Sequence, residues 1–486
     1  MTRTFSPVLG AALLLAAAPL VAGTAKAPEA SPRAASDRLV GTDPGPYVLR
    51  APYERFRLDN GLTVILHKDD AQPRVAVNLW YHVGSSRERP GRTGFAHLFE
   101  HLMFEGSKNV PEGSFDRWLE AAGGDNNGST TEDRTNYWEE VPPSALELAL
   151  FLESDRMGFL LDTMTKERVD GQRDVVKNER RQSYENRPYG EADLVLPGLL
   201  WPNGHPYSWT VIGSMRDLTA ASYDDVTHFF QTYYAPGNAS LVIAGPIDVE
   251  QTKAWVQRWF SDVPKGRAVP PQEPMPASLS VEKAAVLEDD VQLPKLVLAW
   301  PTVPAFAHGD AALDAVAAVL GEGKQSRLHK RLVYELEMAQ SVDVYHASQK
   351  LGGTFAVEIV ARPGKSLREV LDVVDEEITH LQAEGPSERE LGRTKNRFEA
   401  SFFDAFERVR GFGGRADRMN LYAFLTGEPD GFAKDLARYR ALTSADINNA
   451  SVRFLTKGRV VLSVVPTGQQ ALAARPDNRA QKAGAP

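Results

Sequence analysis

The chain has 486 residues and contains no cysteine. Disulfides, thiolate nucleophiles and cysteine-based metal sites are therefore excluded, and so is a lipid anchor on an N-terminal cysteine. An excess of positive charge is also lacking, because 55 Lys and Arg residues stand against 64 Asp and Glu residues, for a net charge of −9. Nucleic-acid-binding domains usually carry a basic face, so we expect no nucleic-acid partner.

Long apolar segments are scarce, and the one in this sequence stands at the N-terminus. Arg3 precedes an Ala- and Leu-rich stretch, residues 8–21, and Ala25-Lys26-Ala27 offers a small-x-small cleavage site. The stretch contains Pro19 and is shorter than the roughly 20 residues that a membrane span needs. We interpret residues 1–27 as a signal peptide rather than an anchor. The mature protein is then expected to be exported and periplasmic, without a membrane span, with full secretion as the alternative.

Proline-rich segments divide the rest of the chain. Residues 28–50 are rich in Pro, Ala and Ser and predict a flexible linker, and residues 263–280 contain five prolines that interrupt regular structure. A chain of this length is too long for one compact core. We therefore expect an N-terminal domain at residues 51–262 and a C-terminal domain at residues 281–468. Residues 469–486 predict a disordered tail.

Hydrophobic periodicity predicts both helices and strands in each half. Strands are expected at 62–67, 75–83, 239–244, 295–300, 354–361 and 459–465, and helices at 93–104, 145–157, 166–184, 224–234, 310–320, 367–384 and 388–406. The order Leu-Thr, Asp, Phe, turn and strand occurs twice, ending at Pro246 and at Pro466. This ordered match, in which Leu218-Thr219 corresponds to Leu442-Thr443, indicates a duplicated α+β unit.

One short motif, His97-Leu98-Phe99-Glu100-His101, carries specific chemistry. Two His residues four apart lie on one face of a helix, and neutral imidazole is a good zinc ligand. Glu100 borders the same face, where a carboxylate can serve as general base toward a water molecule. The order of residues is that of the inverzincin signature. The alternative is a helix whose two His residues only make hydrogen bonds, since a motif this short can occur by chance.

A catalytic zinc needs a third protein ligand, which should be His, Asp or Glu from another element. The predicted helix at 166–184 and its end offer Glu167, Glu179 and Glu185. The residues alone leave all three candidates open.

The motif and its surroundings resemble the pitrilysin/insulinase family of zinc peptidases, and most closely its processing-peptidase-like, two-domain branch. Matching segments follow in the family's order: the opening strand at 58–62, the active-site helix at 94–106, the substrate-side strand at 123–137, the third-ligand segment at 175–181 and the end of the first half at 236–245. The resemblance runs from Glu54 to Pro466 and is looser in the second half.

The resemblance implies one Zn²⁺ per chain, bound by His97, His101 and Glu179, with Glu100 activating the water. Family members often have a second-shell Glu seven residues before the third ligand. This chain has Gln172 there, which can donate a hydrogen bond but supplies no charge.

The resemblance also implies a fold and a mode of substrate binding. The fold would be α+β, with two similar domains, each a mostly antiparallel sheet with helices packed on one face, forming a clamshell around a chamber. An extended peptide would add to the sheet edge at 126–131, with Asn127 and Thr130 as substrate-binding residues. The alternative for this segment is a plain turn, because Gly-Gly-Asp-Asn-Asn-Gly is strong turn chemistry.

The second half departs from the family's pattern. Many members have an Arg and a Tyr there that reach the substrate, and an ungapped alignment from Arg327 puts Val333 and Gln340 at those positions. Arg331 and Tyr334 lie nearby and are the candidate substitutes. We therefore expect a second subunit to complete the site, in a homodimer or in a heterodimer with a related chain.

The predicted function is that of a zinc-dependent endopeptidase, which hydrolyses peptides or unfolded segments with a zinc-activated water. One alternative is a non-catalytic or conditional subunit that needs a partner chain, and another is a zinc hydrolase of non-peptide substrates. Cleavage of an unstructured peptide by the isolated chain distinguishes the first function from the second.

Overall fold

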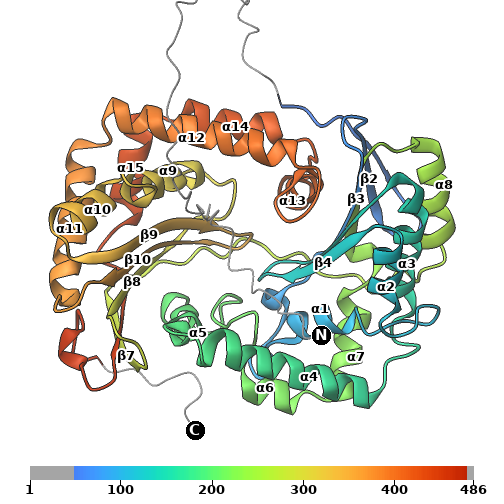
Figure 1. The fold of residues 1–486 in the computed structure, drawn as a ribbon, viewed down its shortest axis with the longest axis horizontal. Coiled ribbons are helices and arrows are strands. Elements are labelled where there is room, and N and C mark those ends of the chain that lie inside the picture. Colours follow the sequence, from blue (N-terminus) through green and yellow to red (C-terminus); the bar gives the residue numbers. More distant parts are fainter. Residues whose placement is uncertain (1–48, 479–486) are drawn as a thin grey trace, which may run out of the picture.

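The computed structural model describes residues 49–478, whose two halves lie side by side around a common centre (Figure 1). The predicted signal peptide at 1–27, nearly all of the predicted linker at 28–50 and the last eight residues of the predicted tail fall outside the described residues. Within residues 49–478, no helix is long and apolar enough to cross a bilayer.

The N-terminal half is built on a six-stranded sheet in the order β1-β2-β6-β3-β5-β4. Its strands are β1 (Glu54–Arg57), β2 (Thr63–Lys68), β3 (Val75–Tyr81), β4 (Asp125–Thr130), β5 (Thr135–Val141) and β6 (Ala239–Gly245). Neighbouring strands are antiparallel except β2 and β6. The central strands β3 and β6 are buried along their whole length, whereas β4 forms an edge of the sheet.

The C-terminal half repeats this topology in a five-stranded sheet with the order β7-β11-β8-β10-β9. Its strands are β7 (Lys283–Asp289), β8 (Lys295–Thr302), β9 (Ala339–Ser348), β10 (Gly353–Ala361) and β11 (Val460–Pro466). The parallel pair is now β7 and β11, and the edge corresponding to β4 is β9. The repeated strand order confirms the predicted α+β class with two similar, mostly antiparallel domains.

Helices surround both sheets. In the N-terminal half they are α1 (Phe95–Leu102), α2 (Ser114–Ala121), α3 (Leu146–Phe159), α4 (Lys166–Arg180), α5 (Gly190–Leu200), α6 (Met215–Ala220), α7 (Tyr223–Tyr233) and α8 (Val249–Phe260). In the C-terminal half they are α9 (Asp310–Gly321), α10 (Arg327–His329), α11 (Leu367–Glu384), α12 (Glu388–Glu407), α13 (Arg415–Thr426), α14 (Phe432–Ala441) and α15 (Ser444–Phe454).

The duplication is most regular in the last helix and strand of each half. Helix α7 begins at a capping box formed by Ser222 and Asp225, and α15 begins at one formed by Thr443 and Asp446. The structure therefore makes Ser222, rather than Thr219, the counterpart of Thr443. The repeat itself was predicted, but the match of Thr219 with Thr443 was wrong.

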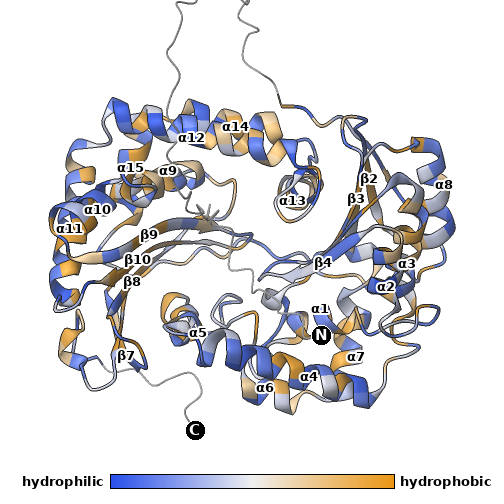
Figure 2. Ribbon diagram, viewed as in Figure 1, coloured by the Kyte–Doolittle hydropathy of each residue, from blue (hydrophilic) through white to orange (hydrophobic). Residues whose placement is uncertain are grey.

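Each sheet packs against helices of its own half on one face and against a helix of the other half on its second face. Helix α13 places Ala416, Met419 and Tyr422 against Val242 and other residues of the N-terminal sheet. Conversely, α5 of the N-terminal half packs against the C-terminal sheet, and Figure 1 shows both helices in these positions. The buried strand residues at the two interfaces belong to β2, β3 and β6 and to β7, β8 and β11, and they are largely hydrophobic (Figure 2). The two halves of the clamshell are thus joined by two apolar interfaces.

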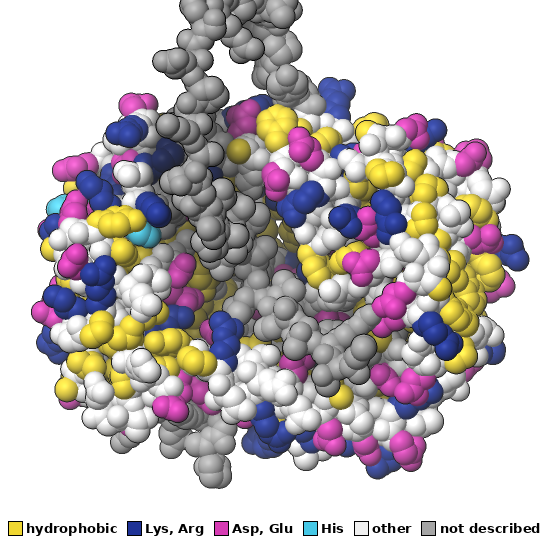
Figure 3. All heavy atoms as spheres, viewed as in Figure 1, with side chains coloured by type: hydrophobic (Ala, Val, Ile, Leu, Met, Phe, Trp, Pro, Cys, Tyr) yellow, Lys and Arg dark blue, Asp and Glu magenta, His cyan; other side chains and the backbone are white. Residues whose placement is uncertain are grey.

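Polar contacts also join the halves where the tips of the hairpins β4–β5 and β9–β10 meet. Asp133 lies at the first tip, Lys350 and Leu351 lie at the second, and Tyr207 comes from the loop after α5. The Tyr207 hydroxyl contacts both carboxylate oxygens of Asp133 at 2.7 Å. The backbone N–H of Lys350 donates to Asp133 at 2.8 Å, and that of Leu351 donates to the Tyr207 hydroxyl at 2.9 Å. Because these groups are largely buried, the contacts fix the two hairpins against each other. On the face shown in Figure 3, basic and acidic side chains are interspersed over both halves.

The chain is ordered over more of its length than the predicted boundaries imply. Residues 469–478 pack onto the C-terminal half, where Ala473 and Ala474 are buried and the Arg475 side chain donates to Glu282 at 2.8 Å. The predicted disordered tail is therefore wrong for these residues, because their small alanines fit against the core.

The proline-rich segment, residues 263–280, contains no helix or strand, yet the backbone N–H of Met275 donates to the carbonyl oxygen of Leu351 at 2.8 Å. The domain boundaries themselves stay predictions.

Candidate metal centre

The helix that carries the His97 motif has an unusual start. Its N-cap residue Gly94 has φ 91°, a left-handed conformation that favours glycine, and offers no capping side chain. Instead, the Glu88 carboxyl accepts hydrogen bonds from the backbone N–H groups of Gly94 at 2.9 Å and Ala96 at 2.8 Å. Burial raises the pKa of Glu88 to about 8, against the lowering effect of these hydrogen bonds. Glu88 thus satisfies N–H groups that the helix itself leaves unpaired.

The two histidines of the motif meet a carboxylate from the last turn of α4. Oε2 of Glu179 lies 3.6 Å from Nε2 of His97 and 3.2 Å from Nε2 of His101. The other two carboxylates considered from the sequence lie outside this cluster, and Glu185 pairs with Arg180 at 2.9 Å. The structure therefore brings together the three residues that the resemblance implies as ligands.

The protonation states of this cluster suit a cation. Burial and the neighbouring His101 lower the pKa of His97, which favours the neutral imidazole that metals bind. Burial alone would raise the pKa of Glu179, but the contact with His101 and the charge of both imidazoles hold it below its usual value.

Two polar atoms of the cluster also lack a well-aligned hydrogen bond. Oε2 of Glu179 and Nδ1 of His97 are buried, and neither makes a well-aligned hydrogen bond with the described residues. Two imidazoles and one carboxylate, converging with one carboxylate oxygen unsatisfied, are the ligand set of a catalytic zinc that keeps a position open. The residues fit the ion.

Glu100 lies beside the cluster and is held by the edge strand. The Thr130 hydroxyl donates to Oε2 of Glu100 at 2.7 Å. At Gly128, a Cβ atom would lie 3.3 Å from Cγ of Glu100 and 3.3 Å from the Tyr137 ring. The absence of a side chain there lets Glu100 pack closely against β4. Tyr137 in turn donates its hydroxyl to the carbonyl oxygen of Phe99 at 3.3 Å, which fixes α1 to the sheet.

The segment expected to bind substrate is a strand, and the alternative of a plain turn is wrong from Asp125 onward. Strand β4 forms the sheet edge and lies next to α1 (Figure 1). The Asn127 side chain is exposed, and its Oδ1 accepts a hydrogen bond from the N–H of Gly128 at 2.8 Å. Thr130 instead faces Glu100. Their substrate-binding roles stay predictions.

The structure does not bring the candidate substrate-binding residues of the second half to this centre. Arg331 and Tyr334 belong to the π-helical segment η5 (Lys330–Glu335), which directly follows α10. Helix α10 and α1 lie in different halves of the molecule and well apart in the view of Figure 1. Arg331 pairs with Glu335 at 3.2 Å, and the Tyr334 side chain is exposed. Among the described residues, the contacts given for Arg331 and Tyr334 are with Glu335 and His329 and not with the metal centre.

Gln172 binds a carboxylate that the sequence reasoning missed. Its amide donates to Oε1 of Glu105 at 2.7 Å, and burial raises the pKa of Glu105 against the lowering effect of the nearby His101. Glu105 lies just beyond the end of α1, so helical spacing does not relate it to His101, and its nearness in sequence was the available signal. Glu88 was also missed, and no sequence signal pointed to it because its contact depends on the loop before α1.

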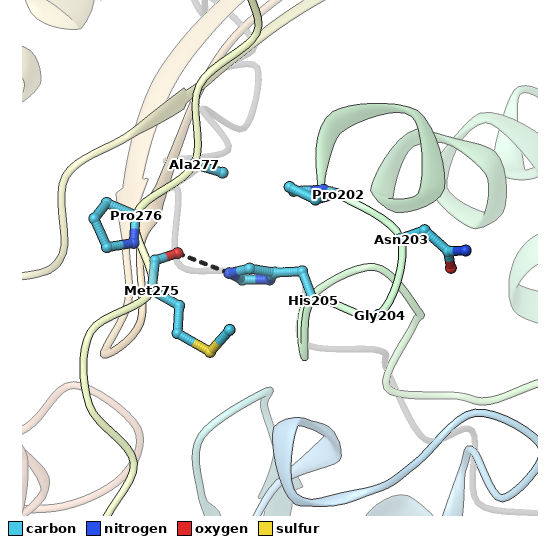
Figure 4. Close-up of a pocket in the computed structure, with 7 residues that line it drawn as sticks. All are labelled: Pro202, Asn203, Gly204, His205, Met275, Pro276 and Ala277. Atoms are coloured by element: carbon cyan, nitrogen blue, oxygen red, sulfur yellow. Dashed lines mark hydrogen bonds between the residues drawn. The ribbon is translucent and has the colours of Figure 1, made fainter.

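A separate pocket lies between the loop after α5 and the proline-rich segment (Figure 4). Figure 4 shows the His205 ring directed at the backbone of Met275, with Nε2 2.8 Å from the carbonyl oxygen. None of the residues that line the pocket belongs to the metal centre. We assign it no part in the chemistry.

Family comparisons agree with this geometry. Residues 63–196 match the model described as Insulinase (Peptidase family M16), and this segment contains all four residues of the centre. Residues 220–398 match the model described as Peptidase M16 inactive domain. The chain belongs to the pitrilysin/insulinase family of peptidases.

Several family members are similar to the chain over much of its length. The zinc protease PqqE of Helicobacter pylori is 33% identical over 292 residues, which span 59% of this chain and 65% of that protein. A probable mitochondrial-processing peptidase subunit beta of Arabidopsis thaliana is 22% identical over 434 residues, spanning 86% of this chain and 79% of that protein. The crystal structure of a protease from Helicobacter pylori shares the fold with a TM-score of 0.80 at 24% identity, and the match covers 86% of this chain and 100% of that chain.

Proposed function

We propose that the chain is a zinc-dependent endopeptidase that hydrolyses peptides or unfolded segments. The observation that carries the proposal is the convergence of His97, His101 and Glu179 beside Glu100 at a sheet edge. The first three residues would hold one Zn²⁺. When bound, zinc supplies a Lewis acid that polarises a carbonyl group and makes a water molecule more acidic.

Glu100 would be the general base of the reaction. Its Oε2 is engaged by Thr130, which leaves Oε1 to accept the proton of the attacking water and to pass it to the departing amine. Thr130 is then a positioning residue for Glu100, a role that its hydrogen bond supports better than direct substrate binding does.

The peptide would bind by pairing with β4. An edge strand offers unpaired backbone N–H and C=O groups, and these bind an extended peptide with modest sequence preference. Asn127 is exposed on this edge and is the candidate for holding the peptide backbone. Folded proteins would be poor substrates, since their chains are not free to extend along the strand.

A second part of the proposal concerns how many subunits form the active site. Arg331 and Tyr334 lie away from the metal centre of their own chain, and one relative is named as a subunit of a processing peptidase. We therefore propose that a second copy or a related subunit completes the site.

Export to the periplasm is proposed from the N-terminal sequence alone, with secretion as the alternative.

The test is cleavage of an internally quenched, unstructured peptide by the purified mature chain over a hundredfold range of enzyme concentration. Turnover that a zinc chelator abolishes supports the peptidase. A specific activity that rises with enzyme concentration supports a homodimer, and activity that appears only with a companion chain supports the heterodimer. Turnover that survives removal of all zinc contradicts the proposal.

A further inference from the structure

A second cluster of metal-binding side chains lies in the C-terminal half. Asp310 and Asp314 stand one turn apart on α9, and His346 lies beside them on β9. Nδ1 of His346 is 2.8 Å from Oδ1 of Asp314 and 3.9 Å from Oδ1 of Asp310. The His346 side chain is fully buried, that of Asp310 is 5% exposed and that of Asp314 is 22% exposed. The cluster is therefore largely shielded from water.

Each of the three side chains also makes a polar contact through its second polar atom. The second oxygen of Asp310 accepts a hydrogen bond from Arg438 at 2.6 Å, and that of Asp314 accepts one from the Tyr439 hydroxyl at 2.5 Å. Nε2 of His346 lies 3.0 Å from the Thr302 hydroxyl. One atom of each residue is thus left pointing toward the other two. Metal ligands are oriented in the same way, by outer partners on their second polar atom.

One of these three converging atoms has no hydrogen-bond partner. Oδ1 of Asp310 is buried and accepts no hydrogen bond from any described residue. His346 has at most one proton on Nδ1, and Asp314 lies closer to it. A buried acceptor left unsatisfied is unfavourable, so the arrangement lacks a positive group at this point.

The charges around the cluster indicate the same deficit. Arg438 is shared between Asp310 and Asp435, with the second contact at 2.8 Å. Asp314 is paired instead with the Tyr439 hydroxyl and His346. Arg418 also acts on Asp435, so with a neutral imidazole the three carboxylates exceed the two guanidinium groups by one negative charge. Such an excess in a mostly buried place is costly without a counter-charge.

We propose that Asp310, Asp314 and His346 form a second site, for a divalent transition-metal ion. Two carboxylate oxygens and one imidazole nitrogen suit Zn²⁺ or Mn²⁺. The ion would cancel the excess charge, satisfy Oδ1 of Asp310 and join α9 to β9, with α14 held through Arg438 and Tyr439. This site stabilises the C-terminal half and does not depend on the proposed peptidase function.

The experiment removes the first site and asks whether an ion remains. The Glu179→Gln variant is stripped of metal, titrated with Zn²⁺ by calorimetry and analysed for bound metal after gel filtration. We expect one Zn²⁺ per chain and a Tm that rises with zinc. Glu179→Gln combined with Asp314→Asn is expected to weaken this binding at least about tenfold and to lose the rise in Tm.

The matched control is Glu179→Gln combined with Asp372→Asn, which changes an exposed Asp on α11 of the same half. It should bind zinc as Glu179→Gln does. No retained ion in Glu179→Gln overturns the proposal, and so does equal zinc affinity in the two double variants. If Asp314→Asn fails to fold by circular dichroism, the stoichiometry of Glu179→Gln and the same titration of Glu179→Gln combined with His346→Gln decide the question.

Discussion

The two halves share a strand order but differ at one helix. Helices α1 and α9 both begin at an N-cap glycine with left-handed backbone, with φ 91° and 99°. Counted from that glycine, the places of His97, Glu100 and His101 in α1 are taken in α9 by Ala312, Ala315 and Val316. These three counterparts are buried in the core. At these three positions, one copy of the helix thus carries the side chains of the first metal centre, and the other copy carries side chains that pack in the core.

This difference shows that the fold by itself does not determine the chemistry. The strand order is kept while three side chains change, and the half with the apolar helix is the one that matches an inactive-domain model. The second half still contributes to the first, because α13 covers a face of the sheet that carries β4. A stable N-terminal domain alone is therefore not expected.

The largest effect should come from changing the two helices at matched positions. His101→Ala is expected to remove the zinc of the first site and to reduce peptide cleavage to background, because two remaining ligands do not hold a catalytic ion. Ala312→Gly in α9 should keep zinc and activity and cost about 0.5–1 kcal/mol of stability. Metal analysis, peptide turnover and urea unfolding check these outcomes. Loss of the first-site zinc in Ala312→Gly would contradict the conclusion that this position of α9 serves packing alone.

A second contrast lies in the buried arginines of the two halves. Arg156 pairs with Glu153 at 2.8 Å and Glu139 at 3.2 Å, and the side chains of both acids are fully buried. Arg156→Met should cost about 3–5 kcal/mol, because it leaves buried carboxylates without a partner.

Arg459 is the matched control in the C-terminal half. It pairs with Asp375 at 2.9 Å and Glu282 at 3.2 Å, and both acids are 23% exposed. Water can solvate these acids, so Arg459→Met should cost less. Urea unfolding of the two variants checks the order, and an equal or larger loss in Arg459→Met would contradict it.

The smallest of these effects should come from Thr130 on the edge strand. Thr130→Val keeps the shape of the side chain and removes the hydrogen bond to Glu100, so kcat should fall about tenfold. KM should change little, because β4 still offers its backbone to the peptide. Thr130→Ser restores the hydroxyl and should restore most of the activity. A rise in KM with unchanged kcat would assign Thr130 to substrate binding instead.

Much of the fold and the core of the site could be predicted from the sequence. Local signals suffice for α1, because His97 and His101 share a helix face, and for the second α+β unit, because the order Asp, Phe, turn and strand occurs in both halves. Glu179 needed the resemblance, since the residues alone left Glu167, Glu179 and Glu185 open as the third ligand.

The features that were missed depend on tertiary contacts. Glu88 contacts α1 across a loop, and α5 and α13 cross between the halves, so no local pattern reports them. Arg331 and Tyr334 were chosen by nearness to an alignment position. Nearness in sequence did not bring them to the metal centre, because η5 follows α10 in the other half.

The most direct test of the account is turnover of the quenched peptide by Glu100→Gln, with zinc content measured on the same sample. The variant keeps all three ligands, so it should bind one Zn²⁺ at the first site as the wild type does. Loss of the general base should lower kcat about 10²–10⁴-fold. Unchanged turnover with zinc still bound would show that Glu100 does not serve as the base and would contradict the mechanism.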